Sequence, residues 1–291
     1  MQEQEELHAA LIQLNRVRLT PAMPTDDARA ALAREHEWRL LELEFLESEL
    51  ASVRPRASQA PRTGEAFVAW FEDLERTGPG QGDPLFPWLA ATARVDEVTW
   101  FLTQEVSGEA GFEDLLALVQ LRMPQPAKLE LARNYWDELG RGRASGMHGP
   151  MLQRLAAALR LEERSIPIVW EALALANAMV GLAANRRFAY QAIGALGVIE
   201  LTAPGRSALV NEGLRRLGLS AHERQYFALH ATLDVKHARA WNREILYTLV
   251  SEQPGVAPWI AEGALVRLDA GRRCFERYRR ELGVETVPRA A

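Results

Sequence analysis

The sequence contains a single cysteine, Cys274, in 291 residues. One cysteine excludes a disulfide within the chain and any metal centre built on several cysteine ligands, and it is typical of a reducing compartment. The chain also lacks a run of 18 apolar residues, and its acidic N-terminus lacks the basic and apolar segments of a signal peptide. We therefore predict a cytoplasmic protein that does not contact a membrane.

Positive charge is not in excess, because 34 Lys and Arg stand against 39 Asp and Glu, a net charge of −5. A nucleic-acid-binding surface normally shows as a basic excess, so we predict no nucleic-acid partner. Alternating β-branched segments of strand length and 20–50-residue repeats are also missing. Apolar residues instead recur at helical spacing, with breaks at Pro and Gly, which predicts an all-α fold.

The predicted helices form two groups. Residues 1–83 are an N-terminal helical extension and linker, whose histidines His8 and His36 have no periodic acidic partners and are predicted at the surface. Residues 84–291 form the helical core, with a break at Ala203-Pro-Gly between helices at 186–201 and 204–217. Its central helix, 220–250, begins at the capping box Ser220-Ala-His-Glu223.

The central helix carries three polar residues in the pattern His230-x3-Asp234-x2-His237. At 3.6 residues per turn, these offsets place the three side chains within about 60° of arc on one stripe. Apolar residues share the stripe and indicate that it is buried; they are Tyr226, Phe227 and Trp241. Burying these groups unsatisfied is costly, so a bound cation is one explanation and a buried His–Asp hydrogen-bond pair is the other.

Further polar residues are predicted to face the interior. Glu105 shares a face with apolar neighbours, and so does Glu138, whereas Asp137 falls on the polar side of its helix. A glycine-rich bend follows Glu138 and could fold His148 back toward it. Glu105 could instead be an ordinary helix-end carboxylate and His148 a helix cap. Glu200 also points inward, either toward the substrate or into a salt bridge with an arginine.

Together, these segments resemble the heme-oxygenase-like diiron oxidases, which are also called the iron-containing redox enzyme family. The resemblance covers about residues 84–282 and rests on Glu105, on Asp137-Glu138-Leu-Gly-Arg-Gly with His148, and on His230-x3-Asp234-x2-His237. It implies a heme-oxygenase-like helical bundle, here with an N-terminal helical extension, in which three carboxylates and three histidines hold two irons. The implied ligands are Glu105, Glu138, His148, His230, Asp234 and His237, and Glu109 is the rival to Glu105.

The resemblance also implies a non-heme diiron, dioxygen-dependent oxidase or oxygenase, and imidazole with carboxylate ligands suits iron or a manganese–iron pair. Its small-molecule substrate would be an amino acid, an amine or a fatty acid. The reaction would be N-oxygenation, desaturation or C–C cleavage in specialised metabolism. We predict substrate contacts from Glu200, Tyr135 and Trp241. An external electron donor and a homodimer are further expectations.

Two other classes of function remain open. The chain could be a helical interaction protein with a structural or regulatory metal site, its extension serving as the partner-binding surface. It could also be a heme-binding or cofactor-free relative of the same bundle. The heme alternative is weakened because a heme needs one axial histidine, whereas this chain offers six potential ligands in three separated segments.

Overall fold

The computed structural model describes residues 2–21, 27–108 and 111–285, and these residues form helices without a β-strand. The α-helices are α1 Gln2–Leu19, α2 Ala28–Ala57, α3 Gly64–Thr77, α4 Leu85–Ala91, α5 Val95–Gly108, α6 Phe112–Val119, α7 Gln125–Glu138, α8 His148–Ala158, α9 Trp170–Ala184, α10 Ala189–Arg216, α11 Gln225–Ala240, α12 Tyr247–Glu252 and α13 Ala257–Leu282. Short 3-10 turns connect several of them. The predicted all-α fold is confirmed.

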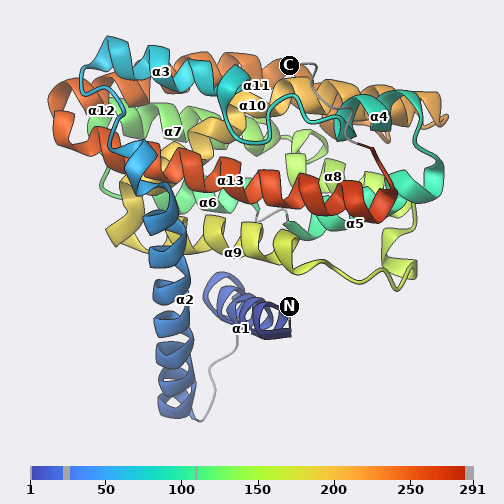
Figure 1. Cartoon of the computed structure of the whole chain (residues 1–291), viewed down its shortest axis with the longest axis horizontal. Coiled ribbons are helices and arrows are strands. Elements are labelled where there is room, and N and C mark those ends of the chain that lie inside the picture. Colours follow the sequence, from blue (N-terminus) through green and yellow to red (C-terminus); the bar gives the residue numbers. More distant parts are fainter. Residues whose placement is uncertain (1, 22–26, 109–110, 286–291) are drawn as a thin grey trace.

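Helix α10 forms the centre of the bundle and packs along both α11 and α13 (Figure 1). Glycines make this close packing possible. A Cβ at Gly194 would collide with the carbonyl group of Ile260 on α13, and one at Gly197 would collide with the indole of Trp241. Glycine at these two positions therefore allows the backbone of α10 to approach its neighbours closely.

The helix break predicted at Ala203-Pro-Gly is wrong, because α10 runs without interruption through Pro204. A proline inside a helix costs about 3 kcal/mol, through a lost hydrogen bond and a steric clash. Buried residues lie on both sides of this proline, among them Leu201 and Val210, and their packing outweighs that cost. As a result, Glu200 and Arg206 project from one continuous helix.

The predicted central helix is present with two local departures. The capping box forms, since the Ser220 amide donates to Glu223 Oε2 (2.7 Å) and the Glu223 amide donates to Ser220 Oγ (3.3 Å). Regular α-helix begins only at Gln225, and Trp241–Leu246 form a π-helical segment before α12. This wider segment begins at Trp241, which is fully buried and faces Gly197.

Helices α1 and α2 project from one side of the bundle, where α1 packs on α9 and α2 packs on α13 and α9 (Figure 1). The prediction that His8 lies at the surface is wrong, because its ring is fully buried between Phe45 and Trp170. His8 lies one helical turn before Leu11 on the inward face of α1. His36 is exposed, as predicted. The domain division at residue 83 stays a prediction.

One stretch, Arg186–Arg216, is long and apolar enough to cross a membrane by length and composition. It contains α10, and 61% of its most apolar window is buried inside the bundle. The core helix of a water-soluble bundle has the same properties, which agrees with the position of α10.

Candidate metal centre

A cavity of about 780 Å³ lies among α5, α6, α8, α10, α11 and α13. This volume is in the range of small-molecule binding sites. Much of its wall is apolar and includes Leu115, Leu152, Met179, Ile199 and Phe227. Six residues that the sequence pointed to also line it, namely Glu105, Glu138, His148, Glu200, His230 and Asp234. Tyr135 and Trp241, which were predicted to contact the substrate, pack in the hydrophobic core and are not among the residues that line the cavity.

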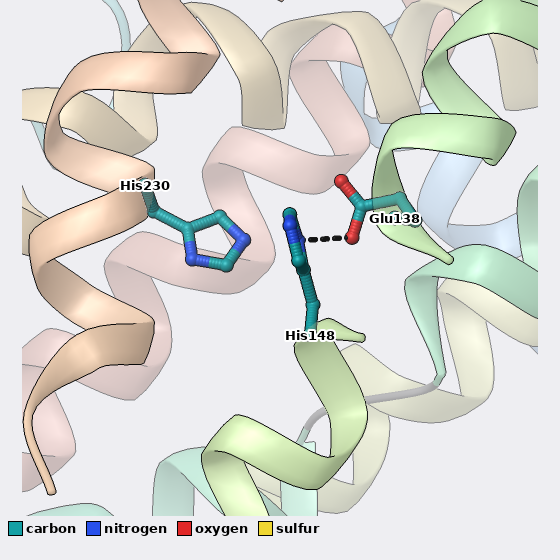
Figure 2. Close-up of side chains that lie close together, drawn as sticks. All are labelled: Glu138, His148 and His230. Atoms are coloured by element: carbon teal, nitrogen blue, oxygen red, sulfur yellow. Dashed lines mark ion pairs between the residues drawn. The ribbon is translucent and has the colours of Figure 1, made fainter. Parts of the chain in front are cut away.

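The first donor group consists of Glu138, His148 and His230, whose potential ligand atoms all lie within 4.8 Å of one another. Figure 2 shows His148 between the other two side chains. His148 Nδ1 lies 2.5 Å from Glu138 Oε2, and the two imidazole rings are 4.7 Å apart and nearly perpendicular. Three helices, α7, α8 and α11, thus contribute one donor each.

The bend between α7 and α8 brings Glu138 and His148 together. An isolated antiparallel bridge pairs Leu139 with Met147, so the residues just outside the bridge are neighbours. Gly140 has a φ of +61°, and a Cβ there would collide with the backbone of Gly146. The tight return therefore requires glycine, and the sequence Gly140-Arg-Gly-Arg-Ala-Ser-Gly supplies it.

The second donor group consists of Glu138, Glu200 and His237, again with ligand atoms within 4.8 Å of one another. All three are buried. His237 Nδ1 lies 3.4 Å from Glu200 Oε2, and Asn134 donates a hydrogen bond to Glu200 Oε1 (2.6 Å). Glu138 belongs to both groups, so the two groups adjoin one another through a single carboxylate.

Like charges crowd this part of the interior. Burial raises the pKa of Asp234 to about 10, with further contributions from the carboxylates of Glu200 and Glu138. Burial and neighbouring imidazoles lower the pKa of His148 and of His230 to about 4. Both rings are therefore neutral near pH 7 and keep a lone pair for a metal. Burial alone would lower the pKa of His237, but contacts with Glu200 and Asp137 raise it to about 9.

Hydrogen bonds fix which nitrogen each imidazole presents. His230 Nδ1 lies 2.7 Å from the carbonyl oxygen of Tyr226, so this nitrogen carries the proton and Nε2 has the lone pair. His237 Nε2 lies 3.1 Å from Asp137 Oδ2, which leaves Nδ1 beside Glu200. A carboxylate behind a ligating histidine is the usual support for a metal ligand.

The donor set fits a bound cation. His148 Nδ1 and His237 Nδ1 are buried and make no hydrogen bond, although each lies close to a carboxylate. A divalent metal would bind the lone pair of His148, displace the Nδ1 proton of His237 and offset the crowded negative charge. Mixed imidazole and carboxylate ligands suit iron and manganese.

The structure places Glu105 away from both donor groups. Its neighbours are Arg206, Arg267 and Tyr278, and burial raises its pKa. The rival residue, Glu109, lies outside the described residues.

Glu113 lies at the site instead, and sequence reasoning missed it. Its Oε1 is 3.2 Å from the point where a Cβ of Gly149 would stand, and its charge partly offsets the burial that lowers the pKa of the adjacent His148. The one available signal was its position three residues before the buried Leu116 on α6. An acidic residue in the first turn of a helix has an ordinary explanation in the helix dipole, which hides that signal.

Asp137 was predicted on the polar side of its helix, away from the interior. That prediction is wrong, because Asp137 contacts the buried His237 and also accepts a hydrogen bond from Arg141 Nε (2.6 Å). The residue sits at the edge between the two faces of α7, where it reaches the solvent with one oxygen and the site with the other.

Comparison with known proteins agrees with this geometry. A family model described as iron-containing redox enzyme matches residues 99–272, which is more than half of the chain and includes both donor groups. A search of curated proteins finds no match. The predicted heme-oxygenase-like helical fold is confirmed by this match together with the helices described above. The chain belongs to the iron-containing redox enzyme family.

Proposed function

We propose that the protein is a dioxygen-dependent oxidase or oxygenase that holds two iron ions, or one iron and one manganese, and acts on a small molecule. The observation that carries this proposal is the position of Glu138 in both donor groups. Two donor sets that share a carboxylate suit two cations bridged by that carboxylate. Membership of an iron-containing redox family supports iron as the metal.

One ion would be held by Glu138, His148 and His230, and the other by Glu138, Glu200 and His237. Asp234 and Glu113 would complete the coordination, since the first lies beside Glu138 and Glu200 and the second beside His148. In this assignment Glu200 is a metal ligand, in addition to lining the space in which a substrate would bind.

The bound metal would supply the electrons that reduce dioxygen. The chain's own groups orient the ligand nitrogens, since Asp137 holds the Nε2 proton of His237 and the Tyr226 carbonyl holds the Nδ1 proton of His230. A metal would displace the second proton of His237, whose pKa is about 9. Apolar wall residues such as Phe227 and Met179 exclude bulk water from the space next to the donors. A cavity of about 780 Å³ accommodates an amino acid, an amine or a fatty acid.

The proposal is tested by adding two equivalents of ferrous iron per chain without oxygen, and then measuring bound iron and the Mössbauer spectrum before and after exposure to oxygen. Two bound irons that become a magnetically coupled ferric pair, with oxygen uptake, are the expected result. Binding of one isolated iron contradicts the two-ion assignment. Two irons without oxygen uptake would instead favour a structural or regulatory metal site.

The carboxylate that completes the site can be identified with a matched pair of variants, Glu113→Gln and Glu105→Gln. Because Glu113 lies beside His148 and Glu105 lies beside two arginines, we expect weaker iron binding only in the first variant. The opposite result would return Glu105 to the ligand set that the sequence resemblance implies.

A further inference from the structure

The surface over the second donor group is formed by α7 and by α11 with the π-helical segment that continues it. The two elements run in opposite directions, because Glu130 lies near Glu244 at one end of the contact and Asp137 contacts His237 at the other. The Asp137 side chain is 19% exposed, whereas His237 is buried. The second donor group therefore reaches the surface of the protein through the contact between His237 and Asp137.

Basic side chains gather on these two elements, although the chain as a whole carries a net charge of −5. Residues 125–147 and 225–246 contain seven Lys and Arg, against three acidic residues besides the buried Glu138 and Asp234. A local excess of positive charge on an acidic protein attracts a partner of opposite charge to that surface.

Several of these basic side chains are not paired within the protein. The three acidic residues each pair with an arginine, namely Arg133, Arg141 and Arg243. Arg143, Lys236 and Arg239 are exposed, and none of them forms an ion pair with a residue that the structure describes. Lys236 precedes His237 in the sequence, and Arg239 lies three residues further along the exposed side of α11. Uncompensated positive charge therefore lies beside the contact between His237 and Asp137.

An exposed aromatic ring lies at the same place. Trp136 precedes Asp137 and is 53% exposed. A Cβ at Gly142 would stand 2.9 Å from its indole, so the ring rests on the bend that also carries Arg141 and Arg143. Tryptophan and arginine are enriched in protein interfaces and often contribute most of the binding energy there. An exposed indole among basic side chains is therefore typical of a docking surface.

The geometry points to this surface as the docking site of a small acidic protein that carries one electron. We call it the basic face and define it by Trp136, Arg143, Lys236 and Arg239. The inference rests on the proposed function, because two electrons passed from ferrous ions to dioxygen must be replaced before the next turnover. Each carrier would lose one electron, which the metal centre gains, so two encounters restore the centre and no covalent bond changes. Complexes of electron carriers have small interfaces, so a surface of this kind suffices.

The test is calorimetric titration of the metal-free and the iron-loaded protein with two acidic carriers, a plant-type ferredoxin and a flavodoxin. We expect both to bind at about 20 mM salt, and at least about 10-fold more weakly at about 500 mM, because salt screens exposed charges. Lys236→Glu and Arg239→Glu should each weaken binding by about 10-fold at low salt and change it little at high salt. Trp136→Ala should weaken it by about 10-fold at either salt concentration, since the indole contributes contact area.

Arg34→Glu is the matched control for the two charge reversals. Arg34 is an exposed arginine of the projecting helix α2, and its substitution changes the net charge of the protein by the same amount. We expect it to leave the affinity for both carriers nearly unchanged. A loss equal to that in Lys236→Glu would show that the net charge, and not the basic face, attracts the carriers, and would overturn the proposal.

Electron transfer is followed separately, by mixing reduced ferredoxin with the oxidised, iron-loaded protein in a stopped-flow instrument. In Lys236→Glu, the rate at low ferredoxin concentration should fall by about 10-fold, because docking is weaker. The rate at saturating ferredoxin should stay the same, since the route from the docked carrier to the metal centre is unchanged. Tight binding without any oxidation of the ferredoxin would overturn the proposal.

Other outcomes separate this proposal from the proposed function. A protein that takes up two irons and consumes oxygen with ascorbate as the reductant, but binds neither carrier, would keep the proposed function and refute the docking site. A short DNA duplex that binds more tightly than both carriers, and loses affinity in the same variants, would assign the basic face to nucleic acid instead. Carrier binding that depends on Lys236, in a chain that takes up no iron, would refute the proposed function and leave a docking surface for an acidic protein.

Discussion

Two buried polar clusters in the described part of the chain differ in charge balance. Between α1, α2 and α9, Arg18 donates hydrogen bonds to both oxygens of Glu42 (3.0 and 2.6 Å), and Asn15 donates to Asn177 (2.7 Å). In the centre of the bundle Glu138, Glu200 and Asp234 are all buried, and burial together with the two neighbouring carboxylates raises the pKa of Asp234 to about 10. The first cluster pairs one positive with one negative group, whereas in the second the carboxylates outnumber the one imidazole, that of His237, whose pKa is raised to about 9.

The difference shows which buried polar residues indicate a function. Burial alone does not, because Glu42 is buried and simply pairs with the mostly buried Arg18. At the centre of the bundle, like charges and two imidazole nitrogens without hydrogen bonds would destabilise the fold unless a cation binds. A buried cluster whose charges are not compensated therefore indicates a bound ligand, whereas a cluster whose charges pair with each other indicates a structural role.

The largest expected effect comes from the residue shared by both donor groups. Glu138→Ala should abolish binding of both irons, because each group loses a ligand, and the metal-free variant should be at least as stable as the parent since a crowded charge is gone. Bound iron is measured after anaerobic loading, and thermal unfolding is followed by circular dichroism. Glu42→Gln, in the balanced cluster, serves as the control and should keep both irons. Full iron occupancy in Glu138→Ala would refute the site.

The balanced cluster should respond in the opposite way. Arg18→Met leaves the Glu42 carboxylate buried without its partner, and we expect a loss of about 3–5 kcal/mol in the free energy of unfolding with iron binding unchanged. Urea denaturation of the metal-free protein gives this value. In the double variant Arg18→Met/Glu42→Leu, most of the loss should be recovered, because no charge is left unpaired. A double variant as unstable as the single one would show that the pair does more than balance charge.

A smaller effect is expected behind the second donor group. Asp137→Asn weakens the support for His237, and iron affinity should fall by about 10- to 100-fold while two irons still bind at saturation. Competition with a chelator measures the affinity. Arg141→Gln removes the other partner of Asp137, on the exposed side, and should change the affinity little. Equal losses in both variants would mean that the ion pair, and not the contact with His237, matters.

The parts of the site that follow from local geometry could be read from the sequence. His230, Asp234 and His237 lie on one stripe because helical spacing puts them there, and the glycine-rich bend indicates the approach of Glu138 and His148. The choice between Glu105 and Glu113 could not be made in this way. Periodicity shows that a side chain faces the interior, but not which interior residues it meets after helices from distant parts of the chain pack together.

The fold could be predicted to a similar extent, and its two wrong predictions have a related cause, namely tertiary packing. Helices and most of their ends follow from periodicity and from Pro and Gly, and the capping box at Ser220 formed as expected. Pro204 misled because its local cost is smaller than the tertiary packing around it, which the sequence does not display. His8 was misplaced in the same way, since the partner that buries it, Trp170, is distant in the sequence.

The smallest effect concerns His8, the buried histidine of α1. Burial, with a contribution from Arg273, lowers its pKa to about 4 in the folded chain, against about 6.5 when unfolded. Since the unfolded chain then binds the proton more readily, the contribution of His8 is complete above about pH 6.5 and is lost progressively as the pH falls toward 4. At about pH 5.5 this loss is about 1 kcal/mol. Urea denaturation of the metal-free protein at about pH 7.5 and 5.5 measures this loss. The free energy of unfolding should fall by about 1 kcal/mol more in the parent than in His8→Gln. An equal fall in both proteins would mean that His8 is protonated in the folded chain. Because His148 and His230 titrate in both proteins, their contributions cancel in the comparison and the difference belongs to His8 alone.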